Sequence, residues 1–378
     1  MSNEPNVSII IPVRNADRTI DVMFQYLEDI DYPKDKLEII IADGDSTDKT
    51  VQITKDWQKK YANIKLTQIP NCKSPGQARN SALKIVTGQY VLFTDGDCAP
   101  EKDWVRKIIA PFFLDPKIGG VGGEVLTLKV DPNNLTESYC EQVRFLSPTG
   151  RCRVKDNGYM PTNEHDFPHE VNGGDDSPFY ATANVAFSKE AIDRIGGEFW
   201  HEPTGEDVDF SLRVLAAGYK IYYAKDAVVK HMHRVDLKSF CKQWFGYGFG
   251  HPLLLAKHAK PNNFEIVLQG KRPVYINIPW FGKGIVHLGT FHWMWIFGFW
   301  TTVELISALF THEYFWVTLF ALLTAWQVLR YLSPVRKLVP KEAFWTFAKV
   351  RYATNWSFMK GAIAGMRKFG TICIEPSW

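Results

Sequence analysis

The stretch Val91–Cys98 reads VLFTDGDC, an apolar run that ends in two aspartates separated by one glycine. The apolar run predicts a buried strand, so Asp95 and Asp97 come directly after its carboxyl end. A Mg²⁺ or Mn²⁺ ion prefers hard carboxylate oxygens and keeps coordination positions for diphosphate oxygens. Gly96 lets the backbone approach such a cluster closely. An Asp-Gly-Asp turn on the surface is the alternative, and the neighbouring segments decide between the two.

Strand and helix patterns alternate on both sides of this stretch. Apolar runs predict strands at 7–13, 37–43, 64–69, 179–188 and 220–231, the last in two short pieces, and helical patterns lie at 17–27, 76–86 and 205–219. This alternation predicts an α/β fold with a parallel sheet and helices on both faces. In such sheets the ligand binds at the carboxyl ends of the strands. Asp43, Asp95 and Asp97 all fall at such ends.

Further polar residues come from the same edge of the predicted sheet. The segment IPVRN ends the first strand, so its backbone near Pro12 and the side chain of Arg14 or Asn15 can face the same pocket. Arg79, in GQARN, is a candidate partner for nucleotide or phosphate oxygens.

The segment GED places Glu206 and Asp207 at a helix start, with Asp209 further along. One carboxylate at that position is a common way to cap a helix. Two adjacent carboxylates exceed that need, so we expect one of them to serve the pocket.

Taken in chain order, six segments resemble glycosyltransferase family 2, whose members have inverting GT-A domains: VSIIIPVRN, ADGDSTD, GQARNSA, TDGDC, ATANVAFSKEAIDRIGGEF and GEDVDFSLRVLAAGY. The resemblance covers about Val7 to His233. It implies that Asp43 binds the nucleobase or ribose, that Asp95 contacts the nucleotide and that Asp97 holds the metal. It makes Asp207 the general base that deprotonates the acceptor hydroxyl, with Glu206 as the competing candidate. The remaining candidates for nucleotide binding are Pro12, Arg14, Asn15, Arg79 and Gly96.

His231 and His233 follow the last predicted strand. In related enzymes a residue near this position completes the metal site or contacts the diphosphate, so His231 is the second candidate metal ligand and His233 a weaker one. An imidazole ligand favours Mn²⁺ over Mg²⁺. The alternative is a solvated strand end.

Three residues are candidates for contact with the acceptor or other parts of the pocket: Asn184, Gln243 and Trp244. Processive cellulose, chitin and hyaluronan synthases carry a QxxRW pattern near the last two. This chain has Gly246 and Tyr247 where Arg and Trp would stand, which argues against processive synthesis and favours transfer of a single sugar.

Two apolar spans follow, at 285–310 and 314–329. The first exceeds the ~20 residues that cross a bilayer, and the second is marginal unless Arg330 snorkels. Basic residues flank the pair (Lys271, Arg272, Lys283, Arg330, Arg336, Lys337, Lys341) and are absent from the turn between the spans. This asymmetry predicts a hairpin with both termini in the cytoplasm. A buried hairpin in a large core is the alternative.

The expected organisation is a GT-A catalytic domain at 1–235, interfacial or linker helices at 236–283, a transmembrane hairpin at 284–333 and a cytoplasmic amphipathic tail at 334–378. The aromatic and basic tail resembles a helix that lies on an anionic membrane face. The net charge of +3 indicates no nucleic-acid partner. The six cysteines contain no CxxC pair, which predicts neither a zinc site nor a disulfide framework. The polar N-terminus predicts no cleavable signal peptide.

The sequence therefore predicts an inverting, Mn²⁺- or Mg²⁺-dependent glycosyltransferase in the inner or plasma membrane, with its catalytic domain in the cytoplasm. It takes one sugar from a nucleotide-sugar donor to a lipid-linked acceptor such as a polyprenyl-diphosphate saccharide. Two alternatives remain: a polyprenyl-phosphate monosaccharide synthase, which needs no general base, and a catalytically silent GT-A scaffold subunit. The sugar, the nucleobase and the oligomeric state are open.

Overall fold

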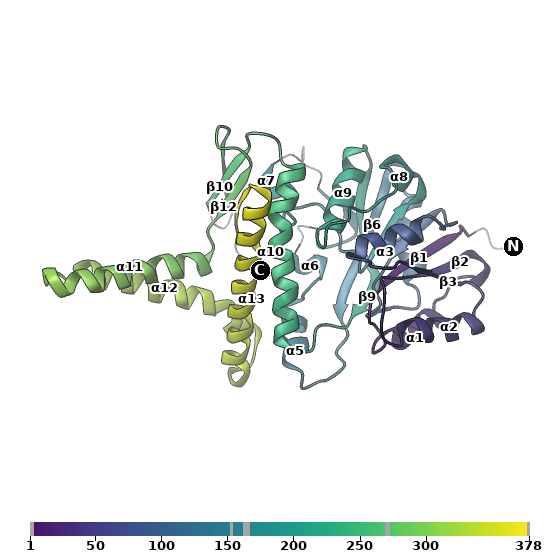
Figure 1. The fold of residues 1–378 in the computed structure, drawn as a ribbon, viewed down its shortest axis with the longest axis horizontal. Coiled ribbons are helices and arrows are strands. Elements are labelled where there is room, and N and C mark those ends of the chain that lie inside the picture. Colours follow the sequence, from purple (N-terminus) through teal and green to yellow (C-terminus); the bar gives the residue numbers. More distant parts are fainter. Residues whose placement is uncertain (1–3, 152–153, 162–166, 269–272, 376–378) are drawn as a thin grey trace. The chain divides into compact units, whose positions relative to one another are not determined.

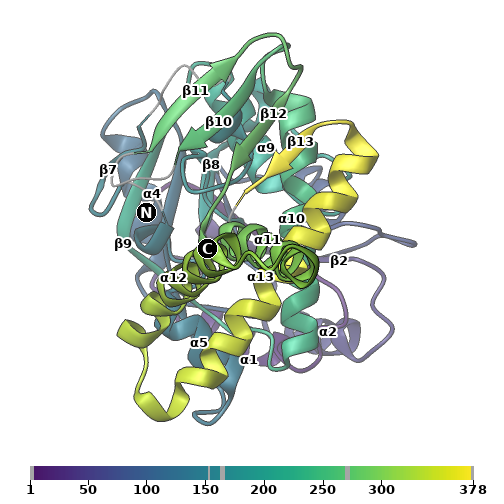
Figure 2. The ribbon, with the colours of Figure 1, turned by 90° about the vertical axis from the view of Figure 1, so that its left-hand side faces the viewer.

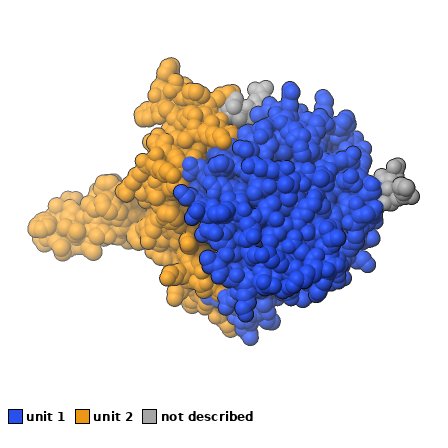
Figure 3. All heavy atoms as spheres, turned by 45° about the vertical axis from the view of Figure 1, so that its right-hand side comes forward, with its two compact units in different colours: residues 1–165, 173–234 blue, residues 166–172, 235–378 orange. Residues whose placement is uncertain are grey.

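The computed structural model describes residues 4–151, 154–161, 167–268 and 273–375. The chain divides into two compact units, coloured separately in Figure 3. Unit 1 comprises Met1–His165 and Gly173–Arg234, and unit 2 comprises Asp166–Asn172 and Val235–Trp378. Three residues weighed in the sequence lie outside the described part: Cys152, Lys271 and Arg272.

Unit 1 is built on one mixed sheet with the strand order β3-β2-β1-β4-β8-β6-β9-β5, and β7 pairs with β9. Its strands are β1 (Val7–Val13), β2 (Leu37–Asp43), β3 (Ile64–Gln68), β4 (Tyr90–Phe93), β5 (Cys98–Pro100), β6 (Ile118–Thr127), β7 (Gly158–Tyr159), β8 (Val185–Ser188) and β9 (Lys220–His231). Its helices are α1 (Ile20–Glu28), α2 (Thr50–Lys60), α3 (Pro75–Leu83), α4 (Trp104–Ile109), α5 (Leu135–Val143), α6 (Pro148–Arg151), α8 (Lys189–Arg194) and α9 (Glu206–Ala216). Short 3₁₀ turns occupy Lys34–Lys36 and Ala110–Phe113.

The strands bury both faces, because successive side chains of a strand point to opposite sides of the sheet. Ile9 and Ile11 of β1 pack in one apolar cluster with Phe24 of α1 and Trp57 of α2. Ile10 packs in the other cluster, which includes Phe210 of α9. Figure 1 shows α1 and α2 on one side of the sheet and α3, α8 and α9 on the other. The predicted α/β fold with helices on both faces is therefore confirmed.

The expectation of a parallel sheet is wrong for β8 in the centre and for β5 and β7, which run antiparallel to β9. β1 pairs in parallel with β2 and β4, but β8 runs antiparallel to both β4 and β6. The predicted strand at 179–188 is limited to β8, since Asn184 donates its backbone N–H to Ala181 within a turn. β9 is one strand with a register shift opposite Gly123 and Glu124 of β6, where the sequence suggested two pieces.

Unit 2 contains two helix pairs and a second sheet. The helices are α7 (Pro168–Val171), α10 (Leu237–His258), α11 (Thr290–Thr311), α12 (Phe315–Leu338) and α13 (Phe344–Phe369), with a 3₁₀ turn at Lys341–Ala343. The sheet has the order β11-β10-β12-β13, formed by β10 (Phe264–Leu268), β11 (Val274–Ile278), β12 (Gly284–His287) and β13 (Ile372–Ile374). Strands β10 and β11 correct the expectation of helices throughout 236–283, and β13 places the end of the tail in the sheet.

Helices α10 and α13 lie side by side in Figures 1 and 2, with glycines at their closest approach. A Cβ on Gly361 would stand 2.1 Å from the carbonyl oxygen of Phe245, and one on Gly248 would stand 2.0 Å from that of Phe358. The aromatic tail is helical as predicted, but its buried side includes Phe347 and Phe358, so much of its apolar surface packs within the unit.

Helices α11 and α12 form the predicted hairpin, joined by a turn at His312, whose φ is 56°. Both are long and apolar enough to cross a membrane, with mean hydropathies of 1.4 and 1.3 over their most apolar windows. Only 6% and 11% of those windows are buried in the protein, unlike the core helices of a soluble domain. Phe310 and Phe315 near the turn are 82% and 69% exposed. The buried-hairpin alternative is therefore not supported.

Candidate active site

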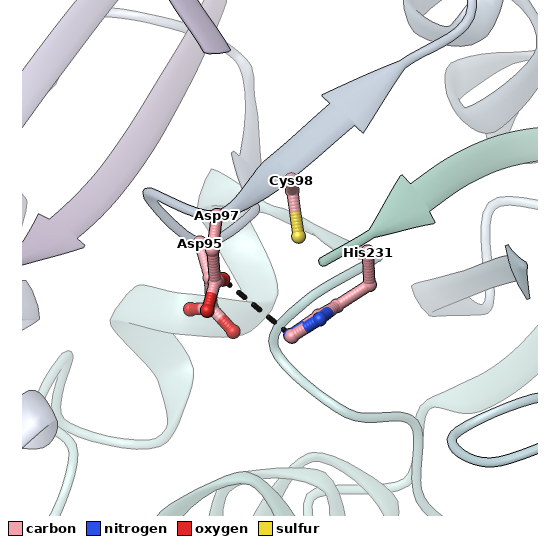
Figure 4. A group of neighbouring side chains, drawn as sticks. All are labelled: Asp95, Asp97, Cys98 and His231. Atoms are coloured by element: carbon pink, nitrogen blue, oxygen red, sulfur yellow. Dashed lines mark ion pairs between the residues drawn. The ribbon is translucent and has the colours of Figure 1, made fainter. Parts of the chain in front are cut away.

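Two carboxylates and an imidazole meet where β4 ends and β5 begins. Strand β5 pairs with β9 so that Cys98 stands opposite His231, and Met232 donates its backbone N–H to the carbonyl of Asp97 at 2.9 Å. This pairing brings the His231 Nε2 atom to 3.4 Å from Asp97 Oδ1. Figure 4 shows the carboxylates of Asp95 and Asp97 and the ring of His231 directed to one region. The structure thus brings together the two residues predicted as metal ligands, with Asp95 beside them.

The donor set fits a divalent cation. Ligating atoms of Asp95, Asp97, Cys98 and His231 all lie within 4.8 Å of one another. Among the described residues, the buried Nδ1 of His231 has no hydrogen-bond partner. Burial and the neighbouring carboxylates of Asp97 and Asp95 raise the pKa of the Cys98 thiol, which keeps it protonated. The set therefore offers two carboxylates and one imidazole, which suit Mn²⁺ or Mg²⁺ better than a soft metal.

Arg79 of α3 joins this cluster to the start of α9. Its guanidinium lies 3.1 Å from Asp95 Oδ1 and 2.8 Å from Glu206 Oε1. The side chain of Arg79 is only 3% exposed, so both ion pairs are shielded from water. The sequence suggested Arg79 as a direct nucleotide contact, whereas the structure engages it with two carboxylates of the site.

The two carboxylates at the start of α9 have different surroundings. Glu206 is buried and paired with Arg79, while Asp207 is half-buried. Asp209 is fully buried and pairs with Arg213 one turn along the helix at 2.9 Å, which gives it a structural partner. Gly205 precedes the helix at a φ of 76°, a backbone conformation that glycine adopts without strain.

A second group of residues surrounds the carboxyl ends of β1 and β2. Val13 and Asp43 are register partners, so the segment from Pro12 to Asn15 lies beside the end of β2. Asp43 is 1% exposed, and its Oδ2 accepts the N–H of Ser46 at 3.2 Å. Among the described residues, its buried Oδ1 has no hydrogen-bond partner. An unused buried carboxylate oxygen is costly, so this atom is suited to accept a ligand's N–H or O–H.

Arg14 and Asn15 are exposed at the rim of this group. Arg14 donates to the carbonyl of Cys72 at 2.9 Å, and the Asn15 carboxamide accepts the N–H of Thr47 at 2.8 Å. Gly96, between the two aspartates, packs directly against β1, where a Cβ would stand 2.7 Å from Cγ1 of Val13. The glycine between the aspartates is therefore required by packing against β1.

Comparison with known proteins identifies this arrangement. Residues 8–195 match the sequence profile of Glycosyl transferase family 2. These residues carry β1, β2, β4, Arg79 and both site aspartates. The chain belongs to glycosyl transferase family 2.

Related glycosyltransferases cover the same region. The chain is 28% identical to the dolichyl N-acetyl-alpha-D-glucosaminyl phosphate 3-beta-D-2,3-diacetamido-2,3-dideoxy-beta-D-glucuronosyltransferase of Methanococcus voltae, over 66% of this chain and 74% of that protein. It is 26% identical to the probable glycosyltransferase YdaM of Bacillus subtilis, over 68% of this chain but 58% of that protein.

A solved structure supports the fold along nearly the whole chain. The mannosyltransferase PcManGT of Pyrobaculum calidifontis superposes with a TM-score of 0.54 at 16% identity, covering 97% of this chain and 88% of that one. At this identity the likeness establishes the fold alone.

In this family 2 glycosyltransferase, the three suggested acceptor residues belong to different units: Asn184 to unit 1, and Gln243 and Trp244 to unit 2. Asn184 is 1% exposed in unit 1, and its Nδ2 donates to the carbonyls of Glu124 and Ala227 at 2.8 Å each. Its Oδ1 accepts the indole N–H of Trp104 at 2.8 Å, so its carboxamide holds β6 and β9 in place. Gln243 and Trp244 lie on α10 in unit 2. Trp244 is buried there, and Gln243 donates to the hydroxyl of Tyr247 at 2.9 Å.

Two further side chains lie around the family 2 aspartates: His233, which the sequence suggested as a weaker metal ligand, and Arg234, which the structure adds. His233 stacks on His231 with ring centroids 5.2 Å apart and contacts Thr127 Oγ1 at 2.9 Å. Burial, followed by the neighbouring His231 and Arg234, lowers the pKa of His233 to about 3, so its ring is neutral. Arg234 lies 3.9 Å from Asp97 Oδ2. Sequence reasoning missed Arg234, although its position three residues after His231 was the available clue.

Proposed function

We propose that this glycosyltransferase moves one sugar, with inversion, from a nucleotide-sugar to a lipid-linked acceptor, using Mn²⁺ or Mg²⁺. The observation that carries the proposal is the convergence of Asp97 and His231, with Asp95 linked through Arg79 to the start of α9. One buried guanidinium is thereby shared by Asp95, on the donor side, and Glu206, which precedes the proposed general base Asp207.

The donor half of the site is assigned to the β1, β2 and β4 ends. The unpartnered Oδ1 of Asp43 accepts a hydrogen bond from the nucleobase or ribose, and the exposed Arg14 and Asn15 lie along the rim. Asp97 and His231, with Asp95, hold the metal. The bound ion supplies positive charge that stabilises the leaving diphosphate.

Asp207 is the proposed general base. In an inverting displacement the acceptor hydroxyl attacks the anomeric carbon from the side opposite the leaving nucleoside diphosphate, and its proton passes to a carboxylate. The carboxylate of Glu206 is already engaged in an ion pair with the buried guanidinium of Arg79, at 2.8 Å. The half-buried Asp207 stands one residue further along the helix start, where its Oδ1 accepts the N–H of Val208 at 2.8 Å.

The lipid nature of the acceptor is supported by the hairpin α11–α12, whose apolar surface is largely uncovered. A relative is named as acting on a dolichyl-phosphate-linked sugar. Arg330 stacks 4.9 Å from the Trp326 ring near the end of α12, in keeping with a basic side chain at a membrane interface. Together with the positive-inside rule, this supports the proposal that unit 1 lies in the cytoplasm, at the inner or plasma membrane.

The deciding experiment uses full-length protein in detergent with Mn²⁺, a lipid extract and a panel of nucleotide-sugars, and measures released nucleoside diphosphate. We expect release with one donor to depend on added lipid and to vanish in Asp97→Asn. The anomeric configuration of the product, measured by NMR, tests inversion. Lipid-independent hydrolysis alone would contradict the acceptor, and no turnover with any donor would favour a silent scaffold.

Single-turnover transfer at saturating donor distinguishes the glycosyltransferase with a general base from the polyprenyl-phosphate monosaccharide synthase. We expect Asp207→Asn to reduce the chemical step by about 10²- to 10⁴-fold with donor affinity nearly unchanged. If Glu206→Gln loses turnover and Asp207→Asn keeps it, the two roles are exchanged. If both variants keep it, the acceptor needs no base, and a polyprenyl-phosphate monosaccharide synthase becomes the better assignment.

A further inference from the structure

A second cluster of ligating side chains lies in unit 2, where the end of the chain meets α10. His251 Nδ1 and Glu375 Oε2 are 3.0 Å apart, and the Sγ of Cys373 is 3.2 Å from the same oxygen. All three ligating atoms lie within 4.8 Å of one another. His251 and Cys373 are 8% and 1% exposed, and the side chain of Glu375 is 9% exposed.

The backbone explains why these groups face each other. Cys373 belongs to β13 and Glu375 follows it by two positions, so their side chains leave the strand on the same face. β13 pairs in parallel with β12, with Ile285 opposite Cys373 and Val286 opposite Ile374. His287 is the last residue of β12 and directly follows Val286 in this pairing.

The charge of the cluster calls for a cation. Asn172, which is 1% exposed, donates its side-chain N–H to the other carboxylate oxygen of Glu375 and fixes its orientation. Among the described residues, no lysine or arginine forms an ion pair with Glu375, and His251 is its ionic partner. A buried carboxylate needs a compensating positive charge. A divalent ion would balance the charge of Glu375 and would bind the Cys373 sulfur as a thiolate after displacing its proton.

We propose that His251, Cys373 and Glu375 bind a structural Zn²⁺ ion, with His287 of β12 or a water molecule in the remaining coordination position. Zinc takes nitrogen, sulfur and oxygen ligands in closed tetrahedral sites. The ion would fix β13 and the end of α13 to α10 and β12. Binding releases the thiol proton of Cys373 and any proton shared between His251 and Glu375, because the ligands bind in their deprotonated forms. This site is separate from the catalytic cluster and does not depend on the proposed reaction.

The competing explanation is a hydrogen-bonded network without metal, in which the thiol and the imidazole both donate to Glu375. The test measures zinc by mass spectrometry in full-length Asp97→Asn protein after dialysis, because this background weakens the catalytic site as a second source of metal. We expect about one equivalent of Zn²⁺, as for a structural site. Adding Cys373→Ser or His251→Gln should remove it.

Cobalt substitution supplies a second measurement with a matched control. Co²⁺ bound through a thiolate gives a near-ultraviolet charge-transfer band, which should disappear in Cys373→Ser and persist in Cys98→Ser. Absence of zinc from the Asp97→Asn protein overturns the proposal, and that result stands whether or not the other variants fold. A cobalt band that follows Cys98 instead of Cys373 overturns it equally.

Discussion

Replacement of Arg79 by methionine tests the link between the metal-binding and acceptor sides of the site. The guanidinium of Arg79 contacts Asp95 at 3.1 Å and Glu206 at 2.8 Å. Methionine keeps much of the side-chain volume but removes the charge. The change therefore leaves the carboxylates of Asp95 and Glu206 without their buried cationic partner.

The expected cost follows from the burial of the three groups. Removing one partner of a buried ion pair costs about 3 to 5 kcal/mol. The side chain of Glu206 is 11% exposed, but that of Asp95 is 29% exposed and regains some solvation. We therefore expect the free energy of unfolding to fall by about 3 kcal/mol, the lower end of that range. For a unit of this size, such a loss lowers the unfolding midpoint by about 6 to 12 °C. Arg79→Met/Glu206→Gln should recover part of the loss, because it removes one stranded charge.

The assay is thermal unfolding of the full-length protein in detergent, followed by intrinsic fluorescence, together with donor affinity by calorimetry. Arg14→Met is the matched control, because Arg14 is exposed at the nucleotide rim and its loss should change stability by no more than about 0.5 kcal/mol. An Arg79→Met protein with a native midpoint and a weakened donor affinity would refute the reasoning. Arg79 would then be a direct nucleotide contact.

Three further predictions address the metal, the hairpin and the helix pair of unit 2. Asp97→Asn should abolish the Mn²⁺ dependence of nucleoside diphosphate binding in calorimetry without changing the unfolding midpoint, and unchanged binding would remove Asp97 from the metal site. His312→Cys should react with an impermeant thiol reagent added outside intact cells, whereas labelling only after lysis would contradict the predicted topology. Gly361→Ala should lower the unfolding midpoint by the equivalent of about 1 to 3 kcal/mol, because its Cβ would meet a backbone carbonyl at 2.1 Å. Gly246→Ala, which meets nothing within 4 Å, should instead stabilise α10 by about 1 kcal/mol, and equal effects of the two changes would refute the close packing of α10 on α13.

Local patterns were sufficient for the elements that carry their own periodicity. The continuous apolar runs of β1 and β2 bury both faces, and such runs predict strands without knowledge of their partners. The long apolar stretches of α11 and α12 likewise predict a hairpin from composition alone. Asp43, Asp95 and Asp97 could be selected because they stand at the carboxyl ends of predicted strands.

Local patterns failed where an element depends on its neighbours. No strand was predicted at β6, because its segment IGGVGGEVLT is rich in glycines, which have low strand propensity. In the structure a Cβ on Gly122 would stand 2.0 Å from the ring of Tyr180, so the packing of this strand favours glycine there. The short β5 contains a proline and exists through its pairing with β9. The antiparallel direction of β8 is a property of the assembled sheet, which no pattern within the strand encodes.

The sequence by itself determined the chemistry available: strand-end aspartates, adjacent carboxylates at a helix start and an apolar hairpin. Only the tertiary structure decided which groups meet. It engaged Arg79 with Asp95 and Glu206, and it set His251 against Glu375, 124 positions along the chain. The physical reason is that propensity and periodicity act over neighbouring residues, whereas ion pairs and metal sites depend on distances that exist only after the sheets have paired and the helices have packed.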